Sequence, residues 1–329
     1  MPDEDPTATM KTSRPIIIAH RGASGYLPEH TLAAKAVAHT MGADYMEQDV
    51  VLTRDGVAIV LHDVYLETTT DVAQRFPERA REDGRFYAID FELAEIRQLR
   101  VRERVHDDHR DAQAVYPQRF PVKPHLFAVP TLREEIELLA GLDKSRDRRT
   151  GIYVEMKSPN WHREEGLDLP GAVLEVLADT GYIERPEQVY LQCFDDQTLL
   201  RLKGELTTPI PLIQLLGDNE WGEDTQADYN WLRTAEGIAY IASYANGIGP
   251  HLSHILTGRD DSGAPRFSEL VAQAHAHNLQ VHPYTFRRDE LPEGVRDFTT
   301  LLDIFVNGAG IDGMFTDFPD MALAFLEPS

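Results

Sequence analysis

Short apolar runs rich in β-forming residues recur along the whole chain, and segments with apolar residues at helical spacing separate them. The apolar runs occupy residues 15–19, 45–51, 57–61, 152–156, 189–192, 210–215, 247–249, 280–284 and 313–316. Helical spacing is found in residues 31–41, 132–142, 171–180, 196–206, 267–277 and 298–307. Strands that alternate with helices pair in parallel, and around eight such units close into a barrel. The pattern therefore predicts one large α/β barrel domain.

One stretch, residues 67–129, breaks this alternation. It is rich in charge, contains the breakers Phe76-Pro77 and Asp83-Gly84, and shows helical periodicity only over residues 91–101. A structureless loop of this length is uncommon in a compact domain. We therefore expect an inserted small subdomain at about 67–129 within a barrel domain of residues 15–329, and a flexible N-terminal segment over residues 1–14.

The chain is strongly acidic, with 32 Lys and Arg against 55 Asp and Glu and a formal net charge of -23. Such a surface repels nucleic acid and anionic lipid, so we expect no nucleic-acid partner. An anionic small-molecule substrate would need local cations or a metal ion at its site. The single cysteine, Cys193, excludes an internal disulfide framework and a multi-cysteine zinc site.

The sequence also bears on where the protein works. No run of it approaches the roughly 20 apolar residues of a membrane span. Residues 1–13 lack the basic start and apolar core of a secretory signal. We therefore expect no stable membrane insertion and a cytoplasmic location for the chain as printed. Removal of a leader from a longer precursor would instead fit a periplasmic or secreted protein.

Acidic residues interrupt two of the apolar runs. Glu47 and Asp49 lie two apart in one run, so they share a face of the strand, and Glu155 with Lys157 repeats the spacing in another. Buried like charges need a counterion or a raised pKa. An all-oxygen set suits Ca²⁺ or Mg²⁺ better than zinc. The alternative is a salt-bridge network in which Lys157 neutralises the carboxylates.

Two histidines stand where strands are expected to end. His20 and Arg21 directly follow residues 15–19, and His62 directly follows residues 57–61. Barrel active sites are built at such positions. Imidazole both accepts and donates a proton near neutrality, so the pair suits a displacement with an alkoxide leaving group, and the Arg21 guanidinium would bind phosphate oxygens. The alternative for either histidine alone is a structural hydrogen bond.

Two other enzyme classes are disfavoured by the same segment. An amidohydrolase-like metal site would need two histidines spaced by one residue on the first strand, where this chain has His20-Arg21-Gly22. A dinucleotide-binding turn needs the G-x-G-x-x-G spacing, which residues 22–25 lack.

Taken in order, these residues resemble the glycerophosphodiester phosphodiesterase family, most closely its bacterial periplasmic type. The first matching blocks are HRGASGYLPEHT at residues 20–31, GADYMEQD at 42–49 and LHD at 61–63. Further counterparts lie at residues 71–76, 87–91, 151–157, 190–195, 246–250, 282–285 and 315–319. The likeness runs from about residue 15 to the C-terminus and includes the insertion.

The resemblance implies a TIM (β/α)8 barrel with a small inserted subdomain. It also implies metal-dependent hydrolysis of glycerophosphodiesters, such as glycerophosphocholine or glycerophosphoethanolamine, to sn-glycerol 3-phosphate and an alcohol. By position, it makes Glu47, Asp49 and Glu155 the ligands of one divalent cation, with Ca²⁺ favoured and Mg²⁺ as the alternative.

For the organic substrate, the resemblance makes His20 and His62 the acid/base pair and Arg21 and Lys157 the phosphate-binding cations. Glu29 would hold the glycerol end of the substrate or the surroundings of the metal. In the chemistry that the family suggests, the glycerol C2 hydroxyl attacks phosphorus and water then opens the cyclic phosphate. We favour His62 as the first base and His20 as the acid.

Several single residues have weaker assignments. Phe194 and Tyr284 follow apolar runs and are expected to bind substrate by shaping the glycerol or alcohol pocket, with core packing as the alternative. Residues for which packing is as plausible a role are Gln192, His282, Trp221 and Trp231. Asp317, two residues before Pro319, is interpreted as a helix start outside the catalytic set.

Two rival functions were weighed against this prediction. A phospholipase D-type phosphodiesterase acting on lysophospholipids or sphingomyelin would need a lipid-facing apolar or basic surface, and the sequence shows none. A binding module on the same barrel would show a lost catalytic residue, and none is lost. Nothing in the sequence specifies a subunit interface, so the protein is expected to be a monomer or a homodimer.

Overall fold

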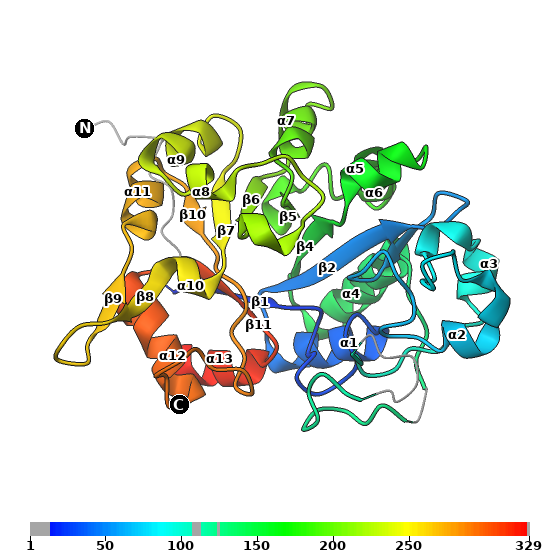
Figure 1. Ribbon diagram of the computed structural model, residues 1–329, viewed down its shortest axis with the longest axis horizontal. Helices are drawn as coiled ribbons and strands as arrows, with labels where there is room; N and C mark the ends of the chain where they lie inside the picture. The colour runs from blue at the N-terminus through cyan, green and yellow to red at the C-terminus, as the bar shows by residue number, and fades with distance from the viewer. Residues whose placement is uncertain (1–13, 107–112, 124–125, 328–329) are drawn as a thin grey trace.

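A computed structural model describes residues 14–106, 113–123 and 126–327, and within them parallel strands form the wall of a barrel (Figure 1). The strands of the wall are β1 (Ile16–Ala19), β2 (Tyr45–Leu52), β4 (Gly151–Met156), β5 (Val189–Cys193), β6 (Leu212–Leu216), β7 (Gly247–Pro250), β10 (Gln280–Val281) and β11 (Gly313–Thr316). Side by side they follow the order β10-β7-β6-β5-β4-β2-β1-β11. Of the predicted flexible segment 1–14, only Arg14 lies within the described residues, and its guanidinium contacts Asp44 at 2.8 Å.

Backbone hydrogen bonds between the segments of β10 and β11, the two ends of this order, close the wall. The N–H groups of Asp312 and Phe315 donate to the carbonyls of Val281 and Pro283 at 3.0 and 3.1 Å. In return, the N–H of Phe286 donates to the carbonyl of Phe315 at 2.8 Å. The predicted TIM barrel is therefore confirmed, and the carboxyl ends of its strands share one rim.

The apolar run at residues 57–61 does not form a barrel strand, contrary to the sequence prediction. Its centre forms β3 (Ala58–Val60), which pairs antiparallel with β2 and places Val50 opposite Val60. Only residues 53–57 connect the two strands. A link this short makes a hairpin, because parallel strands need a crossover of about a dozen residues or more. His62 therefore follows a hairpin arm and not the wall.

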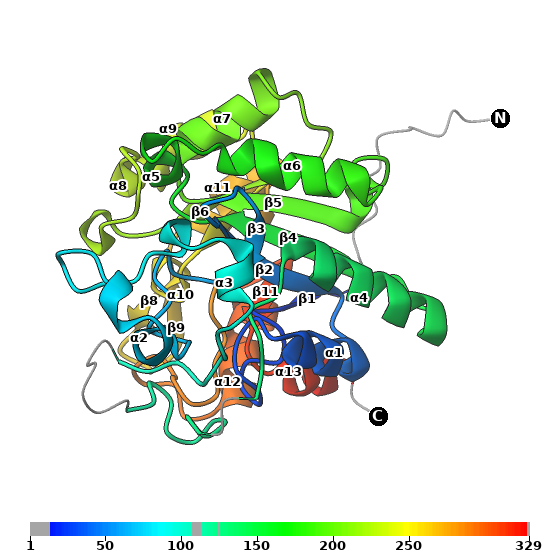
Figure 2. The same cartoon turned by 90° about the vertical axis from the view of Figure 1, so that its right-hand side faces the viewer.

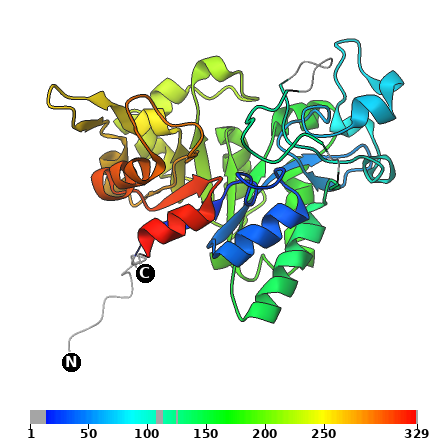
Figure 3. The same cartoon turned by 90° about the horizontal axis from the view of Figure 1, so that it is seen from below.

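Helices cover the outside of the wall (Figure 1, Figure 3). Those at the predicted positions are α1 (Leu32–Met41), α4 (Leu132–Arg146), α6 (Leu169–Asp179), α7 (Asp196–Gly204), α11 (Leu270–Ala276) and α12 (Phe298–Asp303). α13 (Pro319–Leu326) begins where Asp317 and Pro319 predicted a helix start. Elements that the pattern did not predict are α5 (Pro159–Glu164), α8 (Tyr229–Leu232), α9 (Ala235–Ile241), α10 (Leu252–Ile255) and the hairpin of β8 (Leu256–Arg259) and β9 (Pro265–Phe267). Thr31 and Thr131 cap α1 and α4 by accepting backbone N–H groups, as N-cap threonines do. None of the helices that the described residues form is long and apolar enough to cross a membrane.

Alternation along the strands divides the apolar core into two layers. Ile17 belongs to the outer layer, between wall and helices, whereas the next residue, Ile18, belongs to the barrel interior. In the interior Ile18 is buried with Tyr153, Ile213 and Phe315. This packed interior fixes the spacing of the strands, and with it the spacing of the side chains at the rim.

Residues of the insertion form a small apolar core together with the β2–β3 hairpin, on which they pack (Figure 2). Buried residues of this core are Val51, Ile59, Leu66, Val72, Phe86, Phe91, Ile96, Leu99 and Val101. Its regular structure is limited to short pieces, among them α2 (Val72–Arg75) and α3 (Leu93–Ile96). The predicted helix over residues 91–101 is wrong beyond this single turn. Bridge pairing of Val101 with Thr70 and Phe127 keeps the chain extended after the turn.

Candidate active site

A tight turn after β1 brings the first predicted group to the rim. Arg21 has a φ of 59° and Gly22 a φ of 85°. A Cβ at Gly22 would lie 2.8 Å from the carbonyl carbon of Ala34, so only glycine fits. The turn aims the backbone N–H of Arg21 at Glu47, which accepts it at 2.6 Å.

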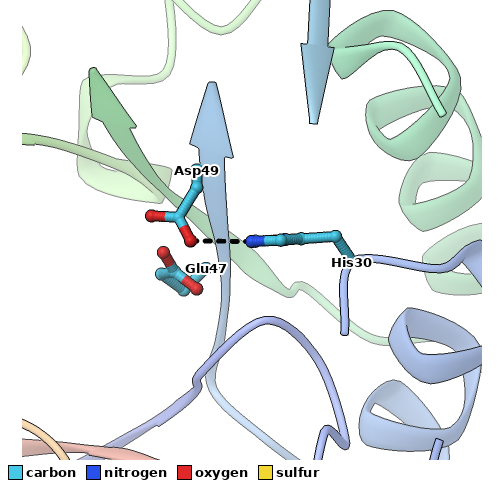
Figure 4. Close-up of side chains that lie close together, drawn as sticks. All are labelled: His30, Glu47 and Asp49. Carbon is cyan, nitrogen blue, oxygen red and sulfur yellow. Dashed lines mark hydrogen bonds and ion pairs between the residues drawn. The ribbon is translucent and has the colours of Figure 1, made fainter. Parts of the chain in front are cut away.

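Glu47 and Asp49 lie on the same face of β2, as predicted (Figure 4). Both are almost fully buried. Nε2 of His30 lies 2.7 Å from Oδ2 of Asp49. Burial, followed by the charge of Asp49, raises the pKa of Glu47 well above its usual value. Burial acts in the same direction on Asp49, but His62, His30 and Arg21 outweigh it and hold the pKa of Asp49 well below its usual value.

These carboxylates fit a divalent cation. Ligand atoms of His30, Glu47 and Asp49 lie within 4.8 Å of one another. Oδ1 of Asp49 is buried without a hydrogen-bond partner, which is costly unless another group pairs with it. A hard cation at this position would pair that oxygen and offset the repulsion between the carboxylates.

Glu155, the third predicted ligand, lies outside that group of three. It stands opposite Asp49 in the β2–β4 register, and Lys157 donates to its Oε1 at 2.6 Å. Burial raises the pKa of Glu155 to about 8, although Lys157 acts in the opposite direction. The structure therefore contains both of the arrangements considered for these residues. Glu47 and Asp49 form a carboxylate cluster with an unpaired oxygen, and Glu155 forms a salt bridge with Lys157.

One cavity of about 210 Å³ collects most of the predicted groups. Its lining includes His20, Arg21, Glu47, His62, Glu155, Lys157, Gln192, Phe194, Trp221, Glu223, Tyr284 and Arg287. Nζ of Lys157 lies 3.4 Å from Nε2 of His62 and 5.5 Å from the centre of the Phe194 ring. The hydroxyl of Tyr284 donates to the carbonyl of Leu216 at 2.9 Å. Positive and apolar surfaces thus face the same space as the carboxylates.

Both histidines are paired with an aspartate. Nδ1 of His20 lies 2.6 Å from Oδ1 of Asp317, and Nδ1 of His62 lies 2.5 Å from Oδ1 of Asp63. An ionised carboxylate only accepts, so each Nδ1 carries the proton and each Nε2 points away from the aspartate. Burial, with the charge of Arg21, lowers the pKa of both histidines to about 4.

α13 begins at Pro319, so the predicted helix start is confirmed, but Asp317 has further partners that this interpretation did not include. The residue at the N-cap position of α13 is Phe318, and the Asp317 side chain is turned to His20 and to two arginines, Arg119 and Arg287, each at 2.8 Å. Sequence position had associated Asp317 with the helix that follows it. Its partners come from segments far away in the chain, so no local pattern could have revealed them.

Glu29 is also held by arginines. Arg21 and Arg104 both bond its carboxylate, at 3.0 Å and at 2.7 to 2.8 Å. Its side chain is 11% exposed and is not part of the cavity lining. The prediction that Glu29 holds the glycerol end or the surroundings of the metal stays a prediction, and the structure shows its contact with the phosphate-binding candidate Arg21.

Several residues that the structure brings to the site had no role assigned from the sequence. His30 and Asp63 lie inside the quoted blocks, next to predicted residues, so their positions were visible. Arg104 and Arg119 belong to the irregular insertion, and no spacing there points to the rim. Among the weaker candidates, Gln192 and Trp221 line the cavity, whereas His282 is buried against Tyr153 at 3.0 Å and Trp231 packs on Tyr240.

Comparisons with known proteins identify the family of the chain. Residues 20–321 match the model of the glycerophosphoryl diester phosphodiesterase family. A curated glycerophosphodiester phosphodiesterase from Haemophilus influenzae is 41% identical, over 97% of this chain and 92% of that protein.

Solved structures are similar along almost the whole chain. A candidate glycerophosphoryl diester phosphodiesterase from Silicibacter pomeroyi aligns with a TM-score of 0.70 and 26% identity, over 96% of this chain and 94% of that one. An Oleispira antarctica phosphodiesterase, solved in complex with its product sn-glycerol-3-phosphate, aligns with a TM-score of 0.61 and 22% identity, over 95% and 96%. From the family match and the close curated relative it follows that the chain is an enzyme of the glycerophosphoryl diester phosphodiesterase family.

Proposed function

We propose that the protein hydrolyses glycerophosphodiesters, such as glycerophosphocholine or glycerophosphoethanolamine, to sn-glycerol 3-phosphate and an alcohol in a metal-dependent reaction. One observation carries the proposal. Two histidines, each paired with an aspartate through Nδ1, face one cavity together with buried carboxylates and three cationic side chains. The product named for the Oleispira antarctica relative is the product expected here.

Charge neutralisation is the first task of such a site. Arg21 and Lys157 line the cavity and would bind the non-bridging oxygens of the phosphodiester. Glu47 and Asp49 would hold the divalent cation. Glu155 would become the third ligand once Lys157 binds the substrate phosphate instead of the Glu155 carboxylate. When bound, the cation supplies positive charge that polarises the phosphoryl group. The oxygen-rich donor set favours Ca²⁺, with Mg²⁺ as the alternative.

Proton transfer falls to the two histidines. The glycerol C2 oxygen forms a bond to phosphorus and gives its proton to Nε2 of His62. The bond from phosphorus to the alcohol oxygen breaks, and His20 protonates that oxygen. Water then attacks the cyclic phosphate, the bond from phosphorus to the C2 oxygen breaks, and the histidines exchange their roles.

The low histidine pKa values suit the base directly, because a neutral ring is the acceptor. The acid must be protonated first. Binding of the phosphodiester anion beside the ring favours the imidazolium, since an adjacent negative charge raises a histidine pKa. The order of the roles, with His62 as the first base, stays a prediction.

Release of sn-glycerol 3-phosphate from glycerophosphocholine tests the proposal, with Ca²⁺, with Mg²⁺ and with chelator. Activity is expected with metal and is expected to be lost with chelator and in His62→Ala. His277→Ala is the matched control, because His277 is exposed at the end of α11 and outside the cavity. A folded protein that releases no product under any metal condition would overturn the proposal.

A further inference from the structure

The surroundings of the two histidines share one arrangement. In each pair, Oδ1 of the aspartate faces Nδ1 of the histidine, and Oδ2 faces an arginine of the insertion. Arg104 contacts Asp63, the partner of His62, and Arg119 contacts Asp317, the partner of His20. The histidines come from different parts of the chain, whereas both arginines come from the insertion.

Arg104 is held in place on several sides. Its Nη1 donates to Oδ2 of Asp63 at 2.7 Å, and its Nε and Nη2 donate to the two oxygens of Glu29. The hydroxyl of Thr68, another insertion residue, donates to the same Oδ2 of Asp63 at 2.6 Å. The Arg104 side chain is only 17% exposed, so this is an interior contact and not a loose surface pair.

Arg119 is the counterpart on the other histidine. Nη2 of Arg119 lies 2.8 Å from Oδ2 of Asp317, and the side chain is 5% exposed. Its guanidinium packs over the Tyr116 ring at 3.7 Å and also bonds Asp289 at 2.8 Å. Asp317 has a second cation, since Nε of Arg287 donates to its Oδ2 at 2.8 Å.

An arginine on the far oxygen of an aspartate has two effects on the histidine. It keeps the aspartate ionised, so the carboxylate accepts the Nδ1–H and cannot remove that proton. It also fixes the direction of the carboxylate, and therefore the plane and the tautomer of the ring. Without it, the aspartate can turn to solvent or to another donor, and Nε2 is no longer reliably free for the substrate.

We propose that the insertion is a positioning element for both catalytic histidines, with Arg104 acting through Asp63 on His62 and Arg119 acting through Asp317 on His20. The inference rests on the proposed function for its kinetic readout. It gives the insertion a role in the proton transfers of the reaction, although none of its described residues lines the cavity.

A double-mutant cycle tests whether Arg104 acts on His62 through Asp63. We expect Arg104→Met to lower kcat about 10- to 100-fold, the range typical of residues that orient a catalytic group, with a smaller change in KM. We expect Arg104→Lys to recover part of the loss. If Arg104 acts through Asp63, adding Arg104→Met to Asp63→Asn leaves kcat within about twofold of Asp63→Asn alone. Effects that multiply, or a loss confined to KM through Glu29, would overturn the inference.

Arg79→Met is the matched control. Arg79 is an arginine of the insertion that bonds Glu95 at 2.6 Å and packs over Phe91 at 4.4 Å, with no contact to Asp63 or Glu29. Its loss loosens the insertion without touching either histidine pair. We expect kcat to stay at the wild-type value. An equal loss of kcat in Arg79→Met and Arg104→Met would mean that both substitutions act by loosening the insertion as a whole, and it would overturn the inference.

A spectroscopic readout separates this inference from the proposed function. The ¹⁵N shifts of the His62 ring distinguish the Nδ1–H from the Nε2–H tautomer. We expect the Nδ1–H form in the wild type and a mixture in Arg104→Met, with the same form retained in Arg79→Met. A wild-type protein that releases no sn-glycerol 3-phosphate would count against the proposed function alone. An unchanged tautomer in Arg104→Met would count against the positioning inference alone.

The effect of Arg119 on His20 through Asp317 is expected to be weaker than that of Arg104 on His62. Arg287 still bonds Asp317 when Arg119 is replaced, so we expect Arg119→Met to lower kcat less than Arg104→Met does. A larger loss in Arg119→Met would contradict the parallel between the two pairs.

Discussion

The barrel wall and the insertion contribute to the site in different ways. Glu47, Asp49 and Glu155 stand on β2 and β4, whose ladder sets the distance between them. The insertion has short helical turns and a small core that it shares with the β2–β3 hairpin, and it reaches the site with long arginine side chains, Arg104 and Arg119. Groups that must keep a fixed distance lie on the rigid ladder. The two insertion arginines instead contact the aspartates that pair with the histidines.

The largest expected effect lies on the wall. We expect Asp49→Asn to lower kcat/KM about 10³-fold, more than any single substitution in the insertion, because the site loses a charge that acts directly on the reacting group or its cation. Initial rates of sn-glycerol 3-phosphate release across a Ca²⁺ titration measure it. Asp49→Asn activity above that of Arg104→Met would reverse the ranking of the two regions.

Shortening a buried side chain in each region tests whether the insertion and the barrel wall unfold separately. We expect Phe91→Ala to open the insertion locally, because removing a buried phenylalanine costs about 3–5 kcal/mol. Leu191→Ala, in the core of the wall, costs about 2–5 kcal/mol and is expected to lower the stability of the whole barrel. Hydrogen exchange with peptide resolution distinguishes the outcomes. Protection lost across both regions in Phe91→Ala would mean that they unfold as one unit.

The pH dependence of stability should originate in the barrel. His282 is buried in the interior, and burial lowers its pKa to about 4. The unfolded chain binds this proton near pH 6.5, so the free energy of unfolding falls as pH falls from about 6.5 to about 4, by up to about 1.4 kcal/mol per pH unit for one group. Urea unfolding at pH 7, 6 and 5 should show a shallower fall in His282→Gln than in the wild type.

His106→Gln is the control for that series, since His106 belongs to the insertion and is exposed. An unchanged slope in His282→Gln, or an equal change in His106→Gln, would contradict the prediction.

The smallest expected effect concerns the contact between the two regions. Arg81 of the insertion bonds Glu165 of the barrel domain at 2.8 Å, and both side chains are about one-third exposed. We expect Glu165→Gln to lower the free energy of unfolding by less than about 1 kcal/mol, because an exposed pair is screened by water and salt. Thermal melts at low and at 1 M salt measure it. A difference that persists at high salt would mean that the pair is more than a surface contact.

Most of the wall could be predicted from periodicity. The secondary-structure predictions failed where the segment that pairs with a stretch of chain decides its conformation. Residues 57–61 carry a strand signal, but the short link to β2 made them an antiparallel arm. Residues 91–101 carry helical periodicity, but only Leu93–Ile96 is helical, because Val101 forms bridges with the distant residues Thr70 and Phe127.

The sequence by itself determined the barrel, the presence of an insertion, and the histidines, carboxylates and cations of the cavity, because these follow from local periodicity and from short blocks of residues. Asp63 is the sequence neighbour of His62, but only the tertiary structure decided which aspartate pairs with His20 and which arginines contact the two aspartates. Asp317 follows His20 by 297 positions, and Arg104 follows Asp63 by 41. Such pairings depend on how separate elements pack together, and packing leaves no spacing signal in the chain.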